Sequence, residues 1–407
     1  MKKIFFTSSI VLALALFALI GYYYMSPKNS GGDNKSGNIF KNFFPFGGET
    51  GAENTGTSTE NSNNNEIVQT PTTTPIFDQK LRKISSEQVS GAGSADYKAG
   101  TVVRYMERST GHIYEAELFS PKVVRISNTT IPVAYNALWN QKNDMLVSQY
   151  LTDDLKIETY SFKIKISSST ESTIAGTALP KGISDISSTD NSIFYLINDN
   201  VSSSGFVTNF DGSKTKKIWS SDIKNLNSQY INSSIVALTT KPAQNIHGYS
   251  YFVNTNTGAV KKVIGGVAGL STLASPDSNK ILYISQYSDV NMFVFDQQKN
   301  STIKVTPSTF PEKCVWSKQN KDTLYCAVPK SVIDGTSLTL WYKGLSAYID
   351  DIWKYDLKNN TSSIIADLYD ESGEEIDVIK PSLSTNEKYL IFINKKDNSL
   401  WSLDLTK

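Results

Sequence analysis

The feature that most constrains the fold is a four-strand pattern that repeats along the last three-quarters of the chain. The clearest copy consists of LASPDSNKILYIS (273–285) and MFVFDQQKNSTIKV (292–305), in which four short apolar segments are separated by polar turns. Four short strands per unit of about 40–45 residues are typical of a β-propeller blade. Further copies, some of them weaker, lie at 186–219, 231–264, 316–328 with 352–365, and 383–394 with 400–405.

The number of blades follows from the apolar segments that match the second strand of the unit. They lie at 101–105, 144–149, 192–197, 234–239, 280–285, 323–328 and 389–394. The wider spacing before the last of them is explained by an insertion at 329–351. We therefore predict an all-β fold, a seven-bladed β-propeller over residues 79–407.

The last unit ends after its third strand, LWSLDL (400–405), and so lacks an outer strand. KLRKIS (80–85) matches the outer-strand type and precedes the first complete unit. We expect this N-terminal strand to close the ring as the outer strand of blade seven, because an open ring would expose unpaired strand edges.

The units SPDSNKILYIS (275–285) and VFDQQKNSTIKV (294–305) resemble the WD-like repeat of TolB-like β-propellers and of the non-catalytic propeller in prolyl oligopeptidase relatives. The whole layout also resembles membrane-anchored propeller proteins of bacteria for which no activity is known. The resemblance covers about residues 80–407. It implies the fold and no particular activity, because propellers host many unrelated functions.

The first 25 residues predict a transmembrane segment. Two lysines precede an apolar run from Ile4 to about Met25, which exceeds the ~20 residues that cross a bilayer. The positive-inside rule places everything after this run outside the cytoplasm. A cleaved signal peptide is the alternative, and both alternatives export the propeller. We expect a single-pass protein of the cell membrane whose propeller is extracytoplasmic.

Residues 26–78 are rich in Gly, Ser, Thr and Asn, and they predict a disordered linker. The exception is NIFKNFFPFGG (38–48), which contains four phenylalanines. Two roles are open for this segment: contact with the bilayer or the propeller wall, or binding to a partner.

Composition argues against several classes of function. The formal net charge is +1 and no basic tract occurs, whereas nucleic-acid binding relies on concentrated positive charge. The two histidines, His112 and His247, are far apart, so no zinc-ligand spacing exists and we expect no metal or other cofactor. The chain also contains no G-x-S-x-G nucleophile motif. Catalysis is therefore the less favoured reading.

The insertion is the best candidate binding site in the sequence. It carries Trp341, Tyr342 and Tyr348, and such aromatic residues favour interfaces. His247 and Tyr287 lie in connections of the same kind, between second and third strands, and should face the same way. The alternative is that the three rings of the insertion are structural and plug the channel mouth or cap a blade edge.

Cys314 and Cys326 lie at equal distances from Asn320 in the turn between the first two strands of blade six. Directly opposite residues of an antiparallel hairpin bring their Cβ atoms within bridging distance. An exported protein permits oxidation, so we predict a disulfide. Two buried thiols are the alternative.

Two functions of different classes remain. The first is a membrane-anchored extracytoplasmic propeller, monomeric in its propeller, that serves as a binding or scaffold module for a protein or glycan partner at the cell envelope. The alternative is a cell-surface propeller enzyme, a hydrolase or lyase, with its site on the loop face. A convergent pair of carboxylates, or a carboxylate beside His247, would favour the enzyme.

Overall fold

The computed structural model describes residues 79–131, 133–152, 154–165, 173–333 and 336–407. The predicted transmembrane segment, the predicted linker and its Phe-rich segment lie outside these residues. Within the described ranges, no helix is both long and apolar enough to cross a membrane.

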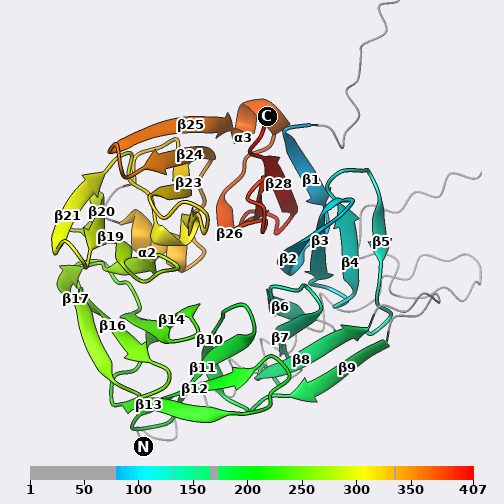
Figure 1. Ribbon diagram of the computed structural model, residues 1–407, viewed down its shortest axis with the longest axis horizontal. Helices are drawn as coiled ribbons and strands as arrows, with labels where there is room; N and C mark the ends of the chain where they lie inside the picture. Colours follow the sequence, from blue (N-terminus) through cyan, green and yellow to red (C-terminus); the bar gives the residue numbers. More distant parts are fainter. Residues whose placement is uncertain (1–78, 132, 153, 166–172, 334–335) are drawn as a thin grey trace, which may run out of the picture. The chain divides into compact units, whose positions relative to one another are not determined.

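The propeller consists of seven four-stranded antiparallel sheets arranged around a central axis (Figure 1). From the innermost strand outward, blade one contains β2 (Val89–Tyr97), β3 (Gly100–Glu107), β4 (Ile113–Glu117) and β5 (Val123–Arg125). Blade two contains β6 (Ala134–Trp139), β7 (Met145–Leu151), β8 (Ile157–Lys165) and β9 (Thr173–Ala178). Blade three contains β10 (Ile183–Ser188), β11 (Ser192–Asn198), β12 (Ser203–Asn209) and β13 (Lys216–Ser221).

The remaining blades follow the same order. Blade four contains β14 (Leu226–Asn232), β15 (Ile235–Thr240), β16 (His247–Asn254) and β17 (Val260–Ala268). Blade five contains β18 (Ser271–Ala274), β19 (Lys280–Gln286), β20 (Val290–Asp296) and β21 (Ser301–Val305). Blade six contains β22 (Cys314–Trp316), β23 (Thr323–Pro329), β24 (Asp350–Asp356) and β25 (Thr361–Asp367). Blade seven contains β26 (Val378–Leu383), β27 (Tyr389–Asn394), β28 (Leu400–Asp404) and β1 (Leu81–Ser85).

The predicted closure of the ring is confirmed. β1 pairs antiparallel with β28, so that Leu81 lies opposite Leu403, and the N–H of Asp404 donates to the carbonyl of Lys80 at 2.8 Å. The N-terminal strand and the last three strands therefore share blade seven. The seven-bladed all-β fold predicted from the repeat is likewise confirmed.

The hydrophobic core is divided among the contacts between neighbouring blades. The described residues form seven buried clusters, and each one joins the facing sides of two adjacent blades. In the cluster that closes the ring, Ile84 and Ile391 of blade seven pack with Val89 and Val103 of blade one. Each blade thus buries apolar area on both of its faces, which accounts for the alternating and continuous apolar runs in the sequence.

The turns between third and fourth strands use the chemistry expected from their sequence. The carboxylate of Asp296 accepts the backbone N–H groups of Gln298 and Lys299, each at 3.0 Å. Asp211 and Asp356 accept turn N–H groups in the same way, and Asp404, at the end of β28, accepts the N–H of Thr406. These aspartates stabilise turns, because a short carboxylate satisfies N–H groups two and three residues onward.

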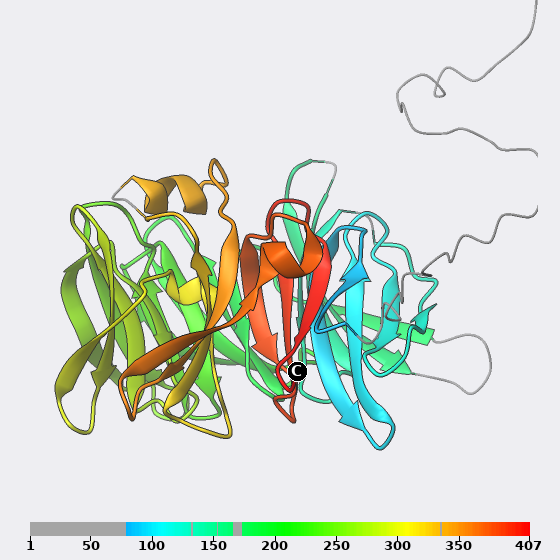
Figure 2. The ribbon, with the colours of Figure 1, turned by 90° about the horizontal axis from the view of Figure 1, so that it is seen from above.

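Antiparallel pairing divides the connections between two faces. Those between first and second strands and between third and fourth strands form what we call the turn face. Those between second and third strands and between blades form the insertion face, because the insertion joins β23 to β24. Figure 2 shows α2 (Ser337–Tyr342), within the insertion, and α3 (Leu368–Ser372), between blades six and seven, on this same face.

Candidate functional site

The insertion connects the second and third strands of blade six, as predicted, but its aromatic side chains are mostly covered. Trp341 is 5 % exposed and Tyr348 is 8 % exposed. Both pack on Phe310, with ring centroids 5.0 Å and 6.1 Å away, and Tyr342 packs on the same ring at 6.3 Å. This burial and these ring contacts are what a structural role for Trp341 and Tyr348 predicts.

Polar contacts hold the insertion to blade seven. The indole N–H of Trp341 donates to the carboxylate of Asp377 at 3.1 Å, and the backbone N–H of Tyr348 donates to the same carboxylate at 3.1 Å. The ammonium of Lys395 donates to the carbonyls of Trp341 and Ser346 at 2.8 and 2.7 Å. These contacts could not be predicted from the sequence, because Asp377 and Lys395 have no unusual local context.

A fully buried ion network lies beneath the insertion. Lys313, at the end of η3 (Pro311–Lys313), is 0 % exposed. Its ammonium binds the carboxylates of Asp350, at 2.5 Å, and Asp377. Burial raises the pKa of Asp350 to about 6, even though the positive charge of Lys313 acts to lower it. Removing the cation would leave the buried carboxylate of Asp350 without a counter-charge, and that of Asp377 with only Lys395, 4.0 Å away.

The two other residues of the predicted binding face are accessible. His247 is the first residue of β16 and is exposed, and Tyr287, between β19 and β20, is 64 % exposed. Within the described ranges the imidazole of His247 makes no hydrogen bond to another side chain. The predicted face thus presents His247 and Tyr287 together with apolar side chains of the insertion such as Leu345, which is 71 % exposed. Partner binding at this face stays a prediction.

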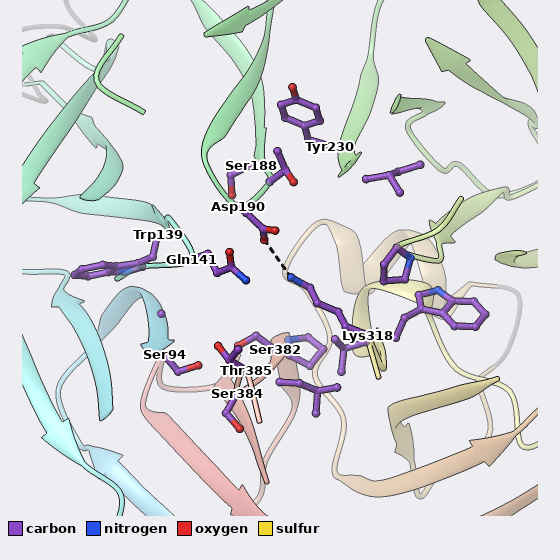
Figure 3. Close-up of a pocket in the computed structure, with 18 of the residues that line it drawn as sticks. Ser94, Trp139, Gln141, Ser188, Asp190, Tyr230, Lys318, Ser382, Ser384 and Thr385 are labelled. Carbon is purple, nitrogen blue, oxygen red and sulfur yellow. Dashed lines mark hydrogen bonds and ion pairs between the residues drawn. The ribbon is translucent and has the colours of Figure 1, made fainter. Parts of the chain in front are cut away.

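A pocket lies at the other end of the channel and opens on the turn face (Figure 3). It has a volume of about 420 Å³ and is lined by residues from all seven blades. Its aliphatic lining includes Leu273, Val315 and Leu383, which come from β18, β22 and β26. We call it the turn-face pocket. The sequence does not reveal this pocket, because each short turn, such as SPDSNK, offers little apolar area by itself.

An ion pair crosses the mouth of the turn-face pocket. The ammonium of Lys318, in blade six, lies 3.2 Å from the carboxylate of Asp190, in blade three (Figure 3). Both side chains are exposed enough that water screens their attraction. The pair therefore contributes little stability, and a ligand could break it at small cost. The other carboxylate in the lining, that of Glu387, accepts the N–H groups of Lys318 and Gln319 at 2.6 and 3.0 Å.

A second pocket, of about 300 Å³, opens toward the insertion face and brings Asp185 and Glu312 into one lining. Asp185 accepts the backbone N–H and the hydroxyl of Ser228 at 2.7 and 2.6 Å. Glu312 accepts the hydroxyl groups of Ser271 and Tyr342. Burial raises the pKa of both carboxyl groups, although these hydrogen bonds act to lower it. We call this the acidic pocket.

The two pockets lie back to back in the channel, since Gln229 and Leu273 line both of them. In the described residues, no group of three or more His, Cys, Asp or Glu side chains could hold a metal ion. The predicted cysteine pair lies beside the turn-face pocket: Cys314 is the direct cross-strand partner of Cys326, and the two are joined by a disulfide.

The propeller is similar to solved structures that are distant in sequence. An oligogalacturonate lyase in complex with manganese matches with a TM-score of 0.54 and 11 % identity, over 80 % of this chain and 94 % of that chain. An oligogalacturonate lyase from Vibrio parahaemolyticus has a TM-score of 0.51 and 10 % identity, over 80 % and 93 % of the two chains. TolB from Acinetobacter baumannii matches with a TM-score of 0.40 and 10 % identity, over 77 % and 63 %.

At these identities the likeness to the two lyases shows the fold alone. No protein-family model matches the sequence, and no curated protein sequence matches it. The pockets themselves are therefore the evidence that bears on function.

Proposed function

We propose that this protein is a binding module of the cell envelope and that its turn-face pocket receives a segment of a protein partner. The observation that carries the proposal is the lining of this pocket, to which all seven blades contribute. A concave site with an apolar lining and a few convergent polar groups is the usual form of a binding site.

The lining favours a peptide over a glycan. Its aliphatic residues, such as Leu273 and Leu383, suit apolar side chains of a peptide. The two tryptophans of the lining, Trp139 and Trp316, are buried, so their rings offer little open face on which a sugar could stack. The Lys318–Asp190 pair at the mouth supplies one charge of each sign to a polar backbone.

The placement at the envelope rests on the sequence, in which Lys2 and Lys3 precede the apolar run that ends near Met25. A membrane-anchored propeller would present its pocket to proteins of the same compartment. A retained anchor and a cleaved leader lead to the same exported location.

Filling the pocket tests the proposal. Thr385 is exposed at the mouth of the turn-face pocket, so Thr385→Trp should block the pocket without disturbing the core. Leu345→Trp places the same ring on the insertion face and serves as the matched control. We expect affinity isolation of the full-length protein from membranes to recover the partner with the wild type and Leu345→Trp, but not with Thr385→Trp. Loss of the partner with Leu345→Trp alone would show that the partner binds the insertion face, as the sequence predicted.

The alternative, a propeller hydrolase or lyase, is favoured by one observation. Asp185 and Glu312 line the same acidic pocket, and burial raises the pKa of both. Carboxyl groups with raised pKa values are suited to general acid–base catalysis near neutral pH. The oligogalacturonate lyases that share the fold act on a glycan, but the low identity transfers neither substrate nor site.

This alternative is tested by activity. An enzyme should cleave a member of a panel of polysaccharides and peptides, and Asp185→Asn and Glu312→Gln should each abolish the cleavage. Unchanged turnover in both variants would remove the acidic pocket from consideration.

A further inference from the structure

Lys380, which has no anionic partner among the described residues, lies next to the residues that line the inner end of the turn-face pocket. The inner strand β26 runs from the insertion face to the turn face, and its residues Pro381, Ser382 and Leu383 line the pocket. Lys380 immediately precedes them. Its ammonium donates to the carbonyl of Ser90 at 2.9 Å and to the side-chain oxygen of Asn136 at 2.8 Å.

The neighbouring inner strands place this ammonium at the same level. Ser90 precedes the pocket-lining residues Ala92–Ser94 of β2, and Asn136 precedes the lining residue Trp139 of β6. Lys380 therefore bridges from blade seven to blades one and two, adjacent to the lining residues farthest from the mouth of the pocket. A ligand that enters from the turn face would reach this ammonium last.

The backbone at this position is unusual. Lys380 has a φ of 51°, in the left-handed region that non-glycine residues rarely adopt, and the pairing of β26 with β27 shifts register between Ile379 and Ser382. A bulge of this kind reorients a side chain relative to a regular strand, and such features gather at functional sites. The fold accepts local strain in order to direct Lys380 across the channel.

The charge of Lys380 is not compensated. In the part of the chain that the structure describes, no carboxylate lies within ion-pair distance of its ammonium, whereas Lys313 contacts two. Burial by the surrounding protein, together with the nearby positive charge of Arg108, lowers the pKa of Lys380 to about 8. The carboxylates that line the pocket, on Asp190 and Glu387, are already engaged by Lys318 and by N–H groups.

An ammonium carries three N–H donors, and Lys380 uses two of them on neutral oxygen atoms. One donor and a whole positive charge remain for a ligand. A carboxylate is the complementary group, because it accepts a charge-assisted hydrogen bond and neutralises the cation.

We propose that the turn-face pocket recognises a carboxylate of its protein partner, which forms an ion pair with Lys380. This inference rests on the proposed function, since it requires that a peptide segment enter the pocket. The carboxylate comes either from the C-terminus of the partner or from an Asp or Glu side chain. The two sources share the same chemistry and are separated by the peptides used below.

The test uses the full-length protein and synthetic heptapeptides of random sequence, prepared with free C-terminal carboxylates and as C-terminal amides. A matched set replaces every Asp and Glu by Asn and Gln. We expect the best binders to lose at least about tenfold in affinity when their carboxylate is neutralised, the magnitude of a hydrogen bond to a charged group. Sensitivity to amidation identifies the C-terminus, and sensitivity to the side-chain replacement identifies Asp or Glu.

Two variants connect this effect to Lys380. Lys380→Met keeps the aliphatic stem and removes the charge, so it should abolish the preference for charged peptides. Lys380→Arg keeps the charge and should retain most of the preference for charged peptides. Circular dichroism and the melting temperature show that each variant is folded.

The outcomes separate the inference from the proposed function. If peptides bind, are blocked by Thr385→Trp, and show the same affinity in charged and neutralised forms, the pocket binds peptides and the role of Lys380 is refuted. If Lys380→Met retains the preference, another cation provides it and the inference is likewise refuted. If no peptide binds in a manner that Thr385→Trp blocks, the proposed function itself fails.

Discussion

Lys313 shows how a single residue can connect parts of the chain that are distant in sequence. Its ammonium joins Asp350, at the start of β24, to Asp377, at the entry to blade seven, and these lie 37 and 64 residues away. Its ammonium also lies 5.4 Å from the ring centroid of Trp341. The cation therefore organises the base of the insertion and the contact between blades six and seven.

We predict that Lys313→Met destabilises the protein by about 3–5 kcal/mol at neutral pH, because it leaves buried Asp350 without a counter-charge and Asp377 with only the more distant Lys395. Lys330→Met is the control, since Lys330 pairs with Asp351 and Asp367 near the surface, and we expect it to cost at most about 1 kcal/mol. Denaturant unfolding measures both. Equal losses in the two variants would show that the buried network does not stabilise the fold.

At the scale of the element, the insertion illustrates what sequence could predict and what it could not. Its position between β23 and β24 follows from the spacing of the repeat. The burial of Trp341 and Tyr348 does not, because it depends on Phe310, Asp377 and Lys395, which have no fixed spacing to the insertion. An aromatic residue in a long loop suits an interface or a core equally well until its neighbours are known.

We predict that Trp341→Ala lowers the free energy of unfolding by about 3–5 kcal/mol, since a large buried ring and its hydrogen bond to Asp377 are lost together. Leu345→Ala, an exposed position of the same insertion, should change it by no more than about 0.5 kcal/mol. Thermal and denaturant unfolding provide the comparison. If Trp341→Ala left stability unchanged and abolished partner binding, the ring would be a contact to the partner and not a structural element.

The hairpin of β22 and β23 carries the disulfide, whose sequence separation is 12 residues. Closing a loop of this size restricts the unfolded chain and stabilises a protein by about 3 kcal/mol. We predict that thiol titration of denatured, non-reduced protein detects no free thiol, and that reduction lowers the melting temperature. Detection of two thiols per chain would contradict the pairing.

At the scale of the whole molecule, the ring is closed by strands from opposite ends of the propeller sequence. This closure could be predicted because the last unit lacked one strand and 80–85 supplied one of the right type. The turn-face pocket could not be predicted, because its lining comes from all seven blades and no single unit contains a recognisable part of it. The bridge made by Lys380 depends on a bulge in β26 that the repeat pattern does not reveal.

Deletion of residues 79–86 should open the ring, because β28 would lose its partner β1 and expose an unpaired strand edge. We expect a lower melting temperature and aggregation in light scattering. Deletion of 26–70, which the sequence assigns to the linker, should leave the melting temperature unchanged. Identical melting of both truncations and the parent would contradict the closing role of β1 in stability.

Site-specific photocrosslinking in cells most directly tests whether the turn-face pocket binds the partner. A photoreactive phenylalanine derivative would replace Gln141 or Thr385 at the mouth of the pocket, and Val332 or Leu345 on the insertion face, in the full-length protein. We predict that the two pocket positions yield one and the same protein adduct and that the two insertion-face positions do not. An adduct formed only from Val332 and Leu345 would show that the partner binds the opposite face and would contradict the proposed function.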